Sequence, residues 1–184
     1  MTIFTFNEQQ SIGEVRSVET SRITIRVTDG QRLQKARVGR LVAIQATGDE
    51  WLIGIVERVW RHPVELPTLD EGEVAEGAAA IQQEENGVAI SLVGTYRARD
   101  GQRHNTFSRA VFALPEINRP VYPIEEKSLE DFMGILSASS KADAATPLKV
   151  GTYTLDGKAS AYIDGDKLFQ RHAALLGSTG SGKS

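Results

Sequence analysis

Eight residues at positions 177–184 have the types and spacing of a loop that binds phosphate. They read Gly177-Ser178-Thr179-Gly180-Ser181-Gly182-Lys183-Ser184 and fit the pattern G-x-x-x-x-G-K-[ST]. Glycines allow positive φ angles and a close approach of the backbone to phosphate oxygens. Successive backbone N–H groups in such a loop form a concave anion site. A merely flexible Gly/Ser tail would not need the Gly-Lys-Ser ending, so the pattern favours nucleotide binding.

The motif also predicts a role for each of its two side chains that carry chemistry. Lys183 would reach the β- and γ-phosphates of ATP as a point charge, and the Ser184 hydroxyl would bind Mg²⁺. The mostly apolar run His172-Ala173-Ala174-Leu175-Leu176 precedes the loop, and we expect it to form a short buried strand. ATP and Mg²⁺ are therefore the cofactors that the sequence predicts.

Hydrolysis needs parts that the sequence does not contain. An acidic strand that holds Mg²⁺, a residue that orients the attacking water and an arginine finger complete such sites, and they would lie beyond Ser184. We therefore assign no catalytic residue within the sequence. We expect the 184 residues by themselves to have no measurable ATPase activity.

The composition is that of an ordinary folded protein. Of 184 residues, 40% are hydrophobic and 24% charged, the formal net charge is −3, and there is no cysteine. These values exclude a broadly basic nucleic-acid surface, a disulfide framework and a cysteine-based zinc site. The first residues lack the basic and apolar parts of a signal peptide, and no apolar run approaches the roughly 20 residues that span a bilayer. We expect a cytoplasmic protein without a membrane partner.

Residues 12 to about 114 are predicted to form short strands separated by turns. Apolar and polar residues alternate most clearly in Arg22-Ile23-Thr24-Ile25-Arg26-Val27, as in a half-buried strand. The other expected strands cover residues 12–18, 40–46, 51–60, 88–96 and 107–114, with turns at Asp29-Gly30 and Asp100-Gly101. This number of strands predicts a small closed barrel or a sandwich. Gly13, Gly54 and Gly94 lie inside the strands, as glycines do at bulges and barrel corners, and favour the barrel.

Two charged segments of the barrel region each allow two interpretations. Residues 63–87 contain seven acidic side chains and no lysine or arginine, which is typical either of a solvated loop or of a surface that docks a basic partner. Arg97, Arg99, Arg103 and Arg109 cluster around the turn at residues 100–101. They either face solvent or contact nucleic acid or an acidic neighbour, such as the acidic segment of an adjacent subunit.

The character of the sequence changes near residue 118. We interpret Asn118-Arg119-Pro120-Val121-Tyr122-Pro123 as a rigid connector. A helix is expected from Ser128, with its apolar residues spaced for packing on one side. A linker follows at residues 137–147, then a hairpin of residues 150–154 and 159–163 across Asp156-Gly157. The predicted domains are residues 1–118, a β-barrel, and residues 119–184, the beginning of a second domain.

The run from Leu168 to Ser184 resembles the HerA family of HerA/FtsK-type ATPases, in which R-H-x-A-I-L-G-S-T-G-S-G-K-S closes the first core strand. Residues 12–15 and 52–56 resemble, more loosely, strands of the HAS barrel that precedes the HerA core. The resemblance implies a mainly β chain: a small HAS-like barrel, followed by the start of a RecA-like α/β P-loop ATPase domain.

The family also implies a function. HerA proteins are homo-hexameric DNA translocases or helicases that hydrolyse ATP and thread double-stranded DNA through their pore. They work with nucleases such as NurA, or beside sirtuin-like or nuclease effectors in antiphage defence. The barrel would mediate ring assembly and docking of the effector, and the long acidic segment departs from the simplest family pattern.

Two other functions fit the same residues. The chain could be a scaffold that recruits an effector, with ATP in a regulatory role. It could instead be an ATP synthase-type subunit, which shares the barrel and the phosphate loop. The loop of those subunits usually reads like G-G-A-G-V-G-K-T, so Gly177 to Ser184 fit HerA better.

Overall fold

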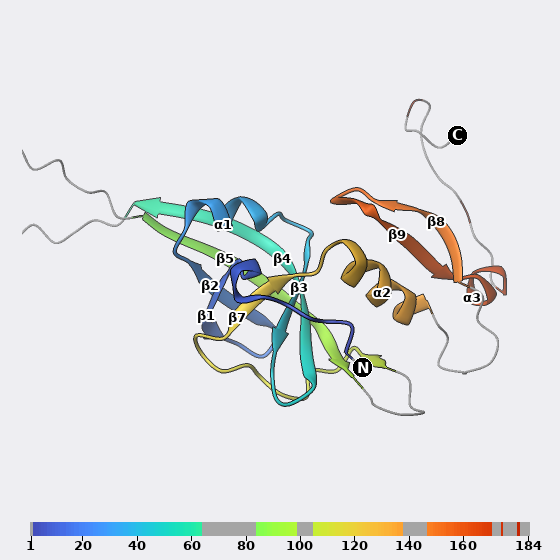
Figure 1. Ribbon diagram of the computed structural model, residues 1–184, viewed down its shortest axis with the longest axis horizontal. Helices are drawn as coiled ribbons and strands as arrows, with labels where there is room; N and C mark the ends of the chain where they lie inside the picture. Colours follow the sequence, from blue (N-terminus) through green and yellow to red (C-terminus); the bar gives the residue numbers. More distant parts are fainter. Residues whose placement is uncertain are drawn as a thin grey trace, which may run out of the picture. The chain divides into compact units, whose positions relative to one another are not determined.

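The computed structural model divides the chain into two compact units, Met1–Ile124 and Glu125–Ser184 (Figure 1). It describes residues 2–63, 84–98, 105–137 and 147–170, together with Ala174 and Gly180. Each unit is considered by itself.

The first unit is a closed β-barrel. Its sheet has the strand order β2-β1-β7-β3-β4-β5-β6, and an additional pairing of β2 with β5 closes a ring of six strands, with β6 attached outside the ring to β5. The prediction of a mainly β chain with a small barrel is confirmed. The strands are β1 (Gly13–Val18), β2 (Arg22–Val27), β3 (Leu41–Gln45), β4 (Glu50–Pro63), β5 (Glu84–Arg97), β6 (Thr106–Ser108) and β7 (Pro120–Pro123).

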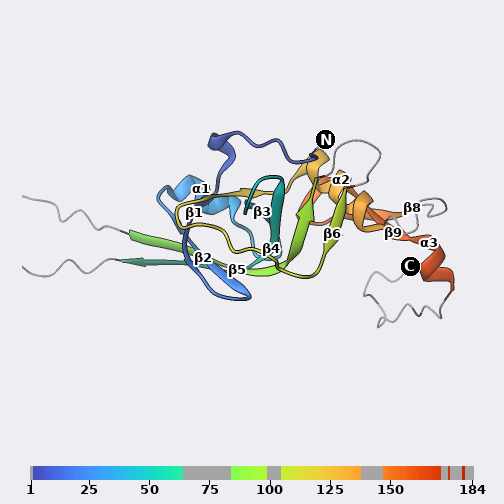
Figure 2. The same cartoon turned by 90° about the horizontal axis from the view of Figure 1, so that it is seen from below.

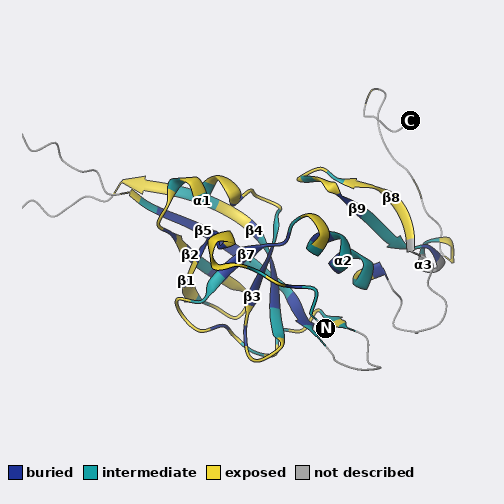
Figure 3. Ribbon diagram, viewed as in Figure 1, coloured by how far each residue is buried: buried dark blue, intermediate teal, exposed yellow. Residues whose placement is uncertain are grey.

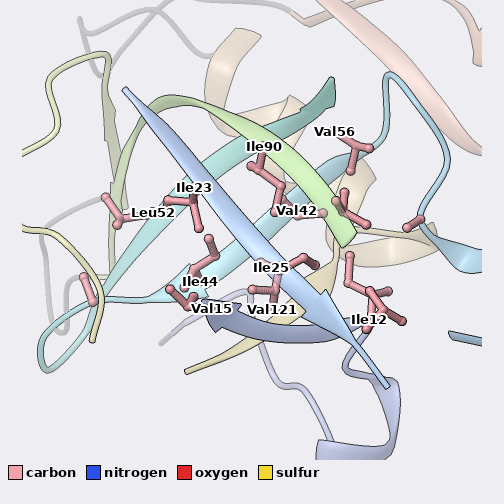
Figure 4. Packing of buried hydrophobic residues seen from close by; sticks show 14 residues of the cluster. Ile12, Val15, Ile23, Ile25, Val42, Ile44, Leu52, Val56, Ile90 and Val121 are labelled. Atoms are coloured by element: carbon pink, nitrogen blue, oxygen red, sulfur yellow. The ribbon is translucent and has the colours of Figure 1, made fainter. Parts of the chain in front are cut away.

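The barrel interior is filled by the inward side chains of these strands. In β2, the predicted alternation places Ile23, Ile25 and Val27 inside, each no more than 2% exposed. Figure 4 shows how side chains from β1, β2, β3, β4, β5 and β7 meet in one cluster. Full burial of one such side chain contributes roughly 1.5–3 kcal/mol, so the closed ring is held mainly by its own apolar core.

Gly54 allows the tight contact between β4 and β5. The register of this pair shifts next to Gly54, and a Cβ at that position would collide with Ile90 Cγ2. Strand-interior glycines mark such irregularities and close approaches. The bend that was expected at this glycine is therefore present in the barrel wall.

Two segments near the end of the barrel differ from the sequence prediction. The expected strand at residues 107–114 is wrong beyond Ser108, because of these residues only Phe107 and Ser108 pair with β5. The expected connector at residues 118–123 is also wrong, since β7 lies between β1 and β3 and completes the ring. The first unit consequently runs to Ile124, six residues beyond the predicted division at residue 118.

The N-terminal segment packs on the barrel through aromatic rings. Phe4 lies 4.9 Å from Tyr96, edge to face, and Phe6 stacks on Tyr122 at 4.7 Å, both between ring centroids. The Ile3 amide donates a hydrogen bond to the Tyr96 hydroxyl at 3.3 Å. A short 3₁₀ helix, η1 (Glu8–Gln10), then leads into β1, with Asn7 as its N-cap.

Strands β4 and β5 are the longest and extend past the other strands as a two-stranded arm (Figures 1 and 2). The nearby helix α1 (Gly30–Lys35) replaces the turn that Asp29-Gly30 predicted. Asp29 is its N-cap, and its carboxylate accepts a hydrogen bond from the Gln31 amide at 2.8 Å. Aspartate favours both turns and N-caps. The change of direction predicted at Asp29 is therefore present, but it begins a helix and not a turn.

The second unit contains helix α2 (Glu126–Ser137), strands β8 (Pro147–Tyr153) and β9 (Asp156–Asp164), and the short helix α3 (Gly165–Phe169). The predicted hairpin is confirmed, although its turn lies at residues 154–155, just before Asp156-Gly157. Helix α2 begins two residues before the predicted Ser128, which therefore lies within the helix and is not its cap.

Candidate functional site

The elements that lead to the phosphate-loop motif are α2 and the β8–β9 hairpin. Helix α2 buries Leu129 and Phe132, and β9 buries Ala159. The two elements contact each other, and the Tyr162 hydroxyl lies 3.2 Å from Glu130 Oε1, to which it donates a hydrogen bond. The contact between α2 and β9 and this hydrogen bond hold the hairpin to the helix within the unit; Figure 3 colours the residues of both elements by their burial.

A charged network joins the start of α2 to the turn end of β9. The Asp156 carboxylate accepts hydrogen bonds from the backbone amides of Glu126 and Lys158. Lys158 in turn pairs with the Glu126 carboxylate, and this hydrogen bond raises the pKa of the Lys158 ammonium above its ordinary value. Glu126 adopts a φ of 48°, which is uncommon for a residue with a side chain. The network holds that strained helix start in place.

Of the predicted phosphate loop, the structure describes Gly180. Its φ is 82°, it is exposed, and a Cβ at this position would meet no heavy atom within 4 Å. Anion-binding nests of backbone amides use positive φ angles, and the contact of Gly180 with phosphate stays a prediction. The other seven residues lie outside the described ones, and their contacts with ATP and Mg²⁺ stay predictions: Gly177, Ser178, Thr179, Ser181, Gly182, Lys183 and Ser184.

The strand predicted at residues 172–176 also lies largely outside the described residues. Ala174 is described, is exposed and belongs to no helix or strand. Ala174 therefore does not support the expected buried strand, and the other residues of the run lie outside the described ones.

The C-terminal segment of the chain is similar to a known protein family. Residues 148–184 match the family described as helicase HerA, central domain. This C-terminal segment is similar to the HerA central domain. The matched part of the chain begins in β8, includes β9 and α3, and ends with the phosphate-loop motif. No curated protein matches the chain.

The predicted arginine cluster lies outside the matched residues and is only partly described. Arg97 Nε lies 2.6 Å from Glu50 Oε1, and its guanidinium carbon lies 4.7 Å from the centre of the Phe112 ring. Arg109 is exposed, whereas Arg99 and Arg103 lie outside the described residues. Arg97 thus contacts Glu50 and Phe112 within the first unit, and a shared role of the four arginines stays a prediction.

The sequence did not predict the exposed apolar segment of residues 111–117. Val111 and Ala113 pack against the barrel core, whereas Phe112, Leu114 and Ile117 are 59%, 51% and 54% exposed. An open pocket of about 410 Å³ is lined by Thr20 and residues 111–114. The alternation that suggested a strand is real, but its outward residues are apolar. That composition was the signal for a contact surface.

Two other kinds of feature are absent from the described ranges. There, no helix combines enough length with enough apolar character to cross a bilayer. Among the same residues, no three His, Asp or Glu side chains come together as a metal site.

Proposed function

We propose that this chain works as part of an ATP-driven hexameric DNA translocase or helicase of the HerA type, in the cytoplasm. The observation that carries the proposal is the family match over residues 148–184, which ends in a complete phosphate-loop motif. A hairpin fixed to a helix precedes that motif, as a scaffold for a loop that must be held still.

The loop residues would act on ATP in distinct ways. Backbone amides around Gly177, Gly180 and Gly182 would donate hydrogen bonds to phosphate oxygens. Lys183 would neutralise charge on the β- and γ-phosphates, and the Ser184 hydroxyl would bind Mg²⁺. Hydrolysis of ATP supplies the free energy for movement along double-stranded DNA.

The barrel would serve assembly of the ring and docking of an effector, either a nuclease or a sirtuin-like protein in antiviral defence. The exposed Phe112, Leu114 and Ile117 support this role, because large apolar side chains exposed close together in the sequence favour a protein contact site. The same segment favours the second candidate function, a scaffold that recruits an effector while ATP has a regulatory role.

A Lys183→Ala variant of the HerA-type protein that contains this sequence tests the proposal. Loss of the phosphate-binding charge should lower DNA-stimulated ATP hydrolysis on the order of 100-fold, measured as phosphate release. Lys149→Ala is the matched control, because Lys149 is exposed on β8, and it should leave hydrolysis unchanged. An equal loss in both variants would contradict the assigned role of the loop.

Two further measurements separate the candidates. The 184-residue chain by itself should release no phosphate, and steady release that depends on Lys183 would contradict this expectation. If the Lys183→Ala protein still binds its effector and supports the effector's activity, recruitment and not translocation is the essential function.

A further inference from the structure

The N-terminal segment, residues 2–7, lies on an aromatic surface of the barrel. That surface is defined here by one side chain from each of β4, β5 and β7: Trp51, Tyr96 and Tyr122. The Phe4 ring centroid lies 4.9 Å from that of Tyr96 and 5.7 Å from that of Trp51. The Phe6 ring stacks on Tyr122 and lies 5.4 Å from Trp51, again between centroids. Two phenylalanines that are two residues apart thus contact the same three rings.

The segment binds this surface in the manner of an extended peptide. Residues 2–7 belong to no helix or strand. Thr5, between the two phenylalanines, is exposed, so alternate side chains face the surface and the solvent, as in an extended chain. The Ile3 amide donates a hydrogen bond to the Tyr96 hydroxyl at 3.3 Å. That contact uses only the peptide backbone, so a segment of another sequence can make it too.

We expect the N-terminal segment to leave this surface without unfolding of the barrel. Ordering six backbone residues costs conformational entropy, which offsets much of the gain from burying two phenylalanine side chains. Segments with few contacts open locally more often than core strands do. Among the described residues, the apolar cluster inside the ring includes neither phenylalanine. Opening would uncover Tyr96 and Tyr122, which are 0% and 7% exposed.

We propose that the aromatic surface is a docking site for an extended peptide of a partner protein with aromatic side chains two residues apart. The N-terminal segment would cover this site until the partner's peptide displaces it. The kind of occupant is inferred from Phe4-Thr5-Phe6 itself, which places two rings on one side of an extended backbone. Because the covering segment is tethered, it has a high effective concentration and keeps weak ligands out.

A peptide copy of the segment is the probe for this site. A fluorescein-labelled peptide of residues 2–8, Thr-Ile-Phe-Thr-Phe-Asn-Glu, should bind a Phe4→Ala/Phe6→Ala chain, measured by fluorescence anisotropy. It should bind the unaltered chain at least about 10-fold more weakly, because the tethered segment competes. The control peptide has alanine in place of both phenylalanines and should bind neither chain.

A pair of tryptophan substitutions tests where the probe binds. Trp51→Ala, added to the Phe4→Ala/Phe6→Ala chain, should abolish binding of the peptide. Trp60→Ala is the matched control, because Trp60 also lies in β4 but packs against Gly87 and not against the aromatic surface. It should leave binding unchanged.

Hydrogen exchange tests the opening of the segment in a chain that retains both phenylalanines. Ile25→Val weakens the core in β2, where Ile25 is 0% exposed. It should speed exchange of the Val56 amide, which donates to the Arg40 carbonyl at 3.0 Å, by about 5-fold. Exchange of the Ile3 amide should not change, because it depends on local opening. If both amides exchange faster by the same factor, the segment opens only with the barrel and the proposal is wrong.

Three further results would overturn the proposal. The first is absence of probe binding by a folded Phe4→Ala/Phe6→Ala chain, and the second is failure of that chain to fold, which would make the segment part of the core. The third is association of unaltered chains, seen by light scattering and lost in the Phe4→Ala/Phe6→Ala variant, which would assign the surface to a second copy. None of these readouts involves nucleotide or DNA, so their failure is distinct from failure of the proposed function.

Discussion

The barrel and the HerA-type segment bury their apolar residues in different ways. The barrel encloses its large aliphatic side chains in one cluster, with Ile23, Ile44, Leu52 and Ile90 all at 0% exposure. In the second unit, Leu148, Val150, Leu155 and Phe169 are 37%, 56%, 38% and 79% exposed. Among the described residues, the unit that contains the family match is therefore the one with the less complete apolar core.

The unit with the complete apolar core and the unit with the phosphate-loop motif are thus different parts of the chain. The barrel closes on itself through the β2–β5 pairing and needs no other element to cover its interior. The phosphate-loop motif instead follows a two-stranded hairpin with one helix against it. Isolated two-stranded sheets are only marginally stable, so we expect the two units to respond differently to the same kind of substitution.

The largest expected effect comes from truncating the barrel core. Leu52→Ala should lower the free energy of unfolding by about 2–5 kcal/mol, because a buried leucine leaves a cavity. Both tryptophans of the chain, Trp51 and Trp60, lie in β4, so their fluorescence during urea unfolding reports the barrel. Val150→Ala, at an exposed apolar position, should change stability by less than about 0.5 kcal/mol. Equal shifts in the two variants would remove the contrast between the units.

A pair of glycine substitutions gives a smaller effect with opposite signs. Gly54→Ala should destabilise the barrel by about 1–3 kcal/mol, because its Cβ would strike Ile90. Gly134→Ala in α2 has no heavy atom within 4 Å of its new Cβ and should stabilise the helix by up to about 1 kcal/mol. Thermal unfolding followed by circular dichroism measures both. Destabilisation by Gly134→Ala would mean that α2 is packed more tightly than the barrel contrast implies.

The smallest expected effect is a dependence of barrel stability on alkaline pH. Burial raises the pKa of the Tyr96 hydroxyl above its ordinary value of about 10. The folded state then holds this proton more tightly than the unfolded state. Its contribution is fully present below pH 10 or so and is lost as the pH rises through the folded pKa.

Tyr96→Phe should therefore make the fall in stability above about pH 10 less steep, measured by tryptophan fluorescence in denaturant at several pH values. Some slope should remain, because burial also raises the pKa of Tyr122 in the same unit. An unchanged slope in the variant would show that Tyr96 does not control the alkaline response of the barrel.

The sequence predicted the parts of the fold that local pattern determines. Alternation in β2 and the interior Gly54 were sufficient to indicate a barrel, since both follow from the pleat of a strand. The phosphate-loop motif and its HerA-type context were equally visible, because the chemistry requires particular residues at fixed spacing.

The errors arose where long-range pairing decides the structure. Val121 and Tyr122 lie between two prolines, which lack a backbone N–H, and nothing local indicated that β1 and β3 would pair with them. Residues 109–114 alternate like a strand, yet pairing with β5 ends at Ser108. Of the candidate site, the described residues give the geometry of Gly180, and the remaining loop residues rest on the motif.

The position of β7 has a practical consequence for dividing this protein. A chain cut after residue 118 would lack β7, the strand between β1 and β3. The edges of β1 and β3 would then have backbone donors and acceptors without hydrogen-bond partners. Such bare edges recruit other molecules edge to edge and promote aggregation. A cut after Ile124 would leave the ring sealed. The choice between cuts six residues apart thus decides whether the isolated barrel is closed or has aggregation-prone strand edges.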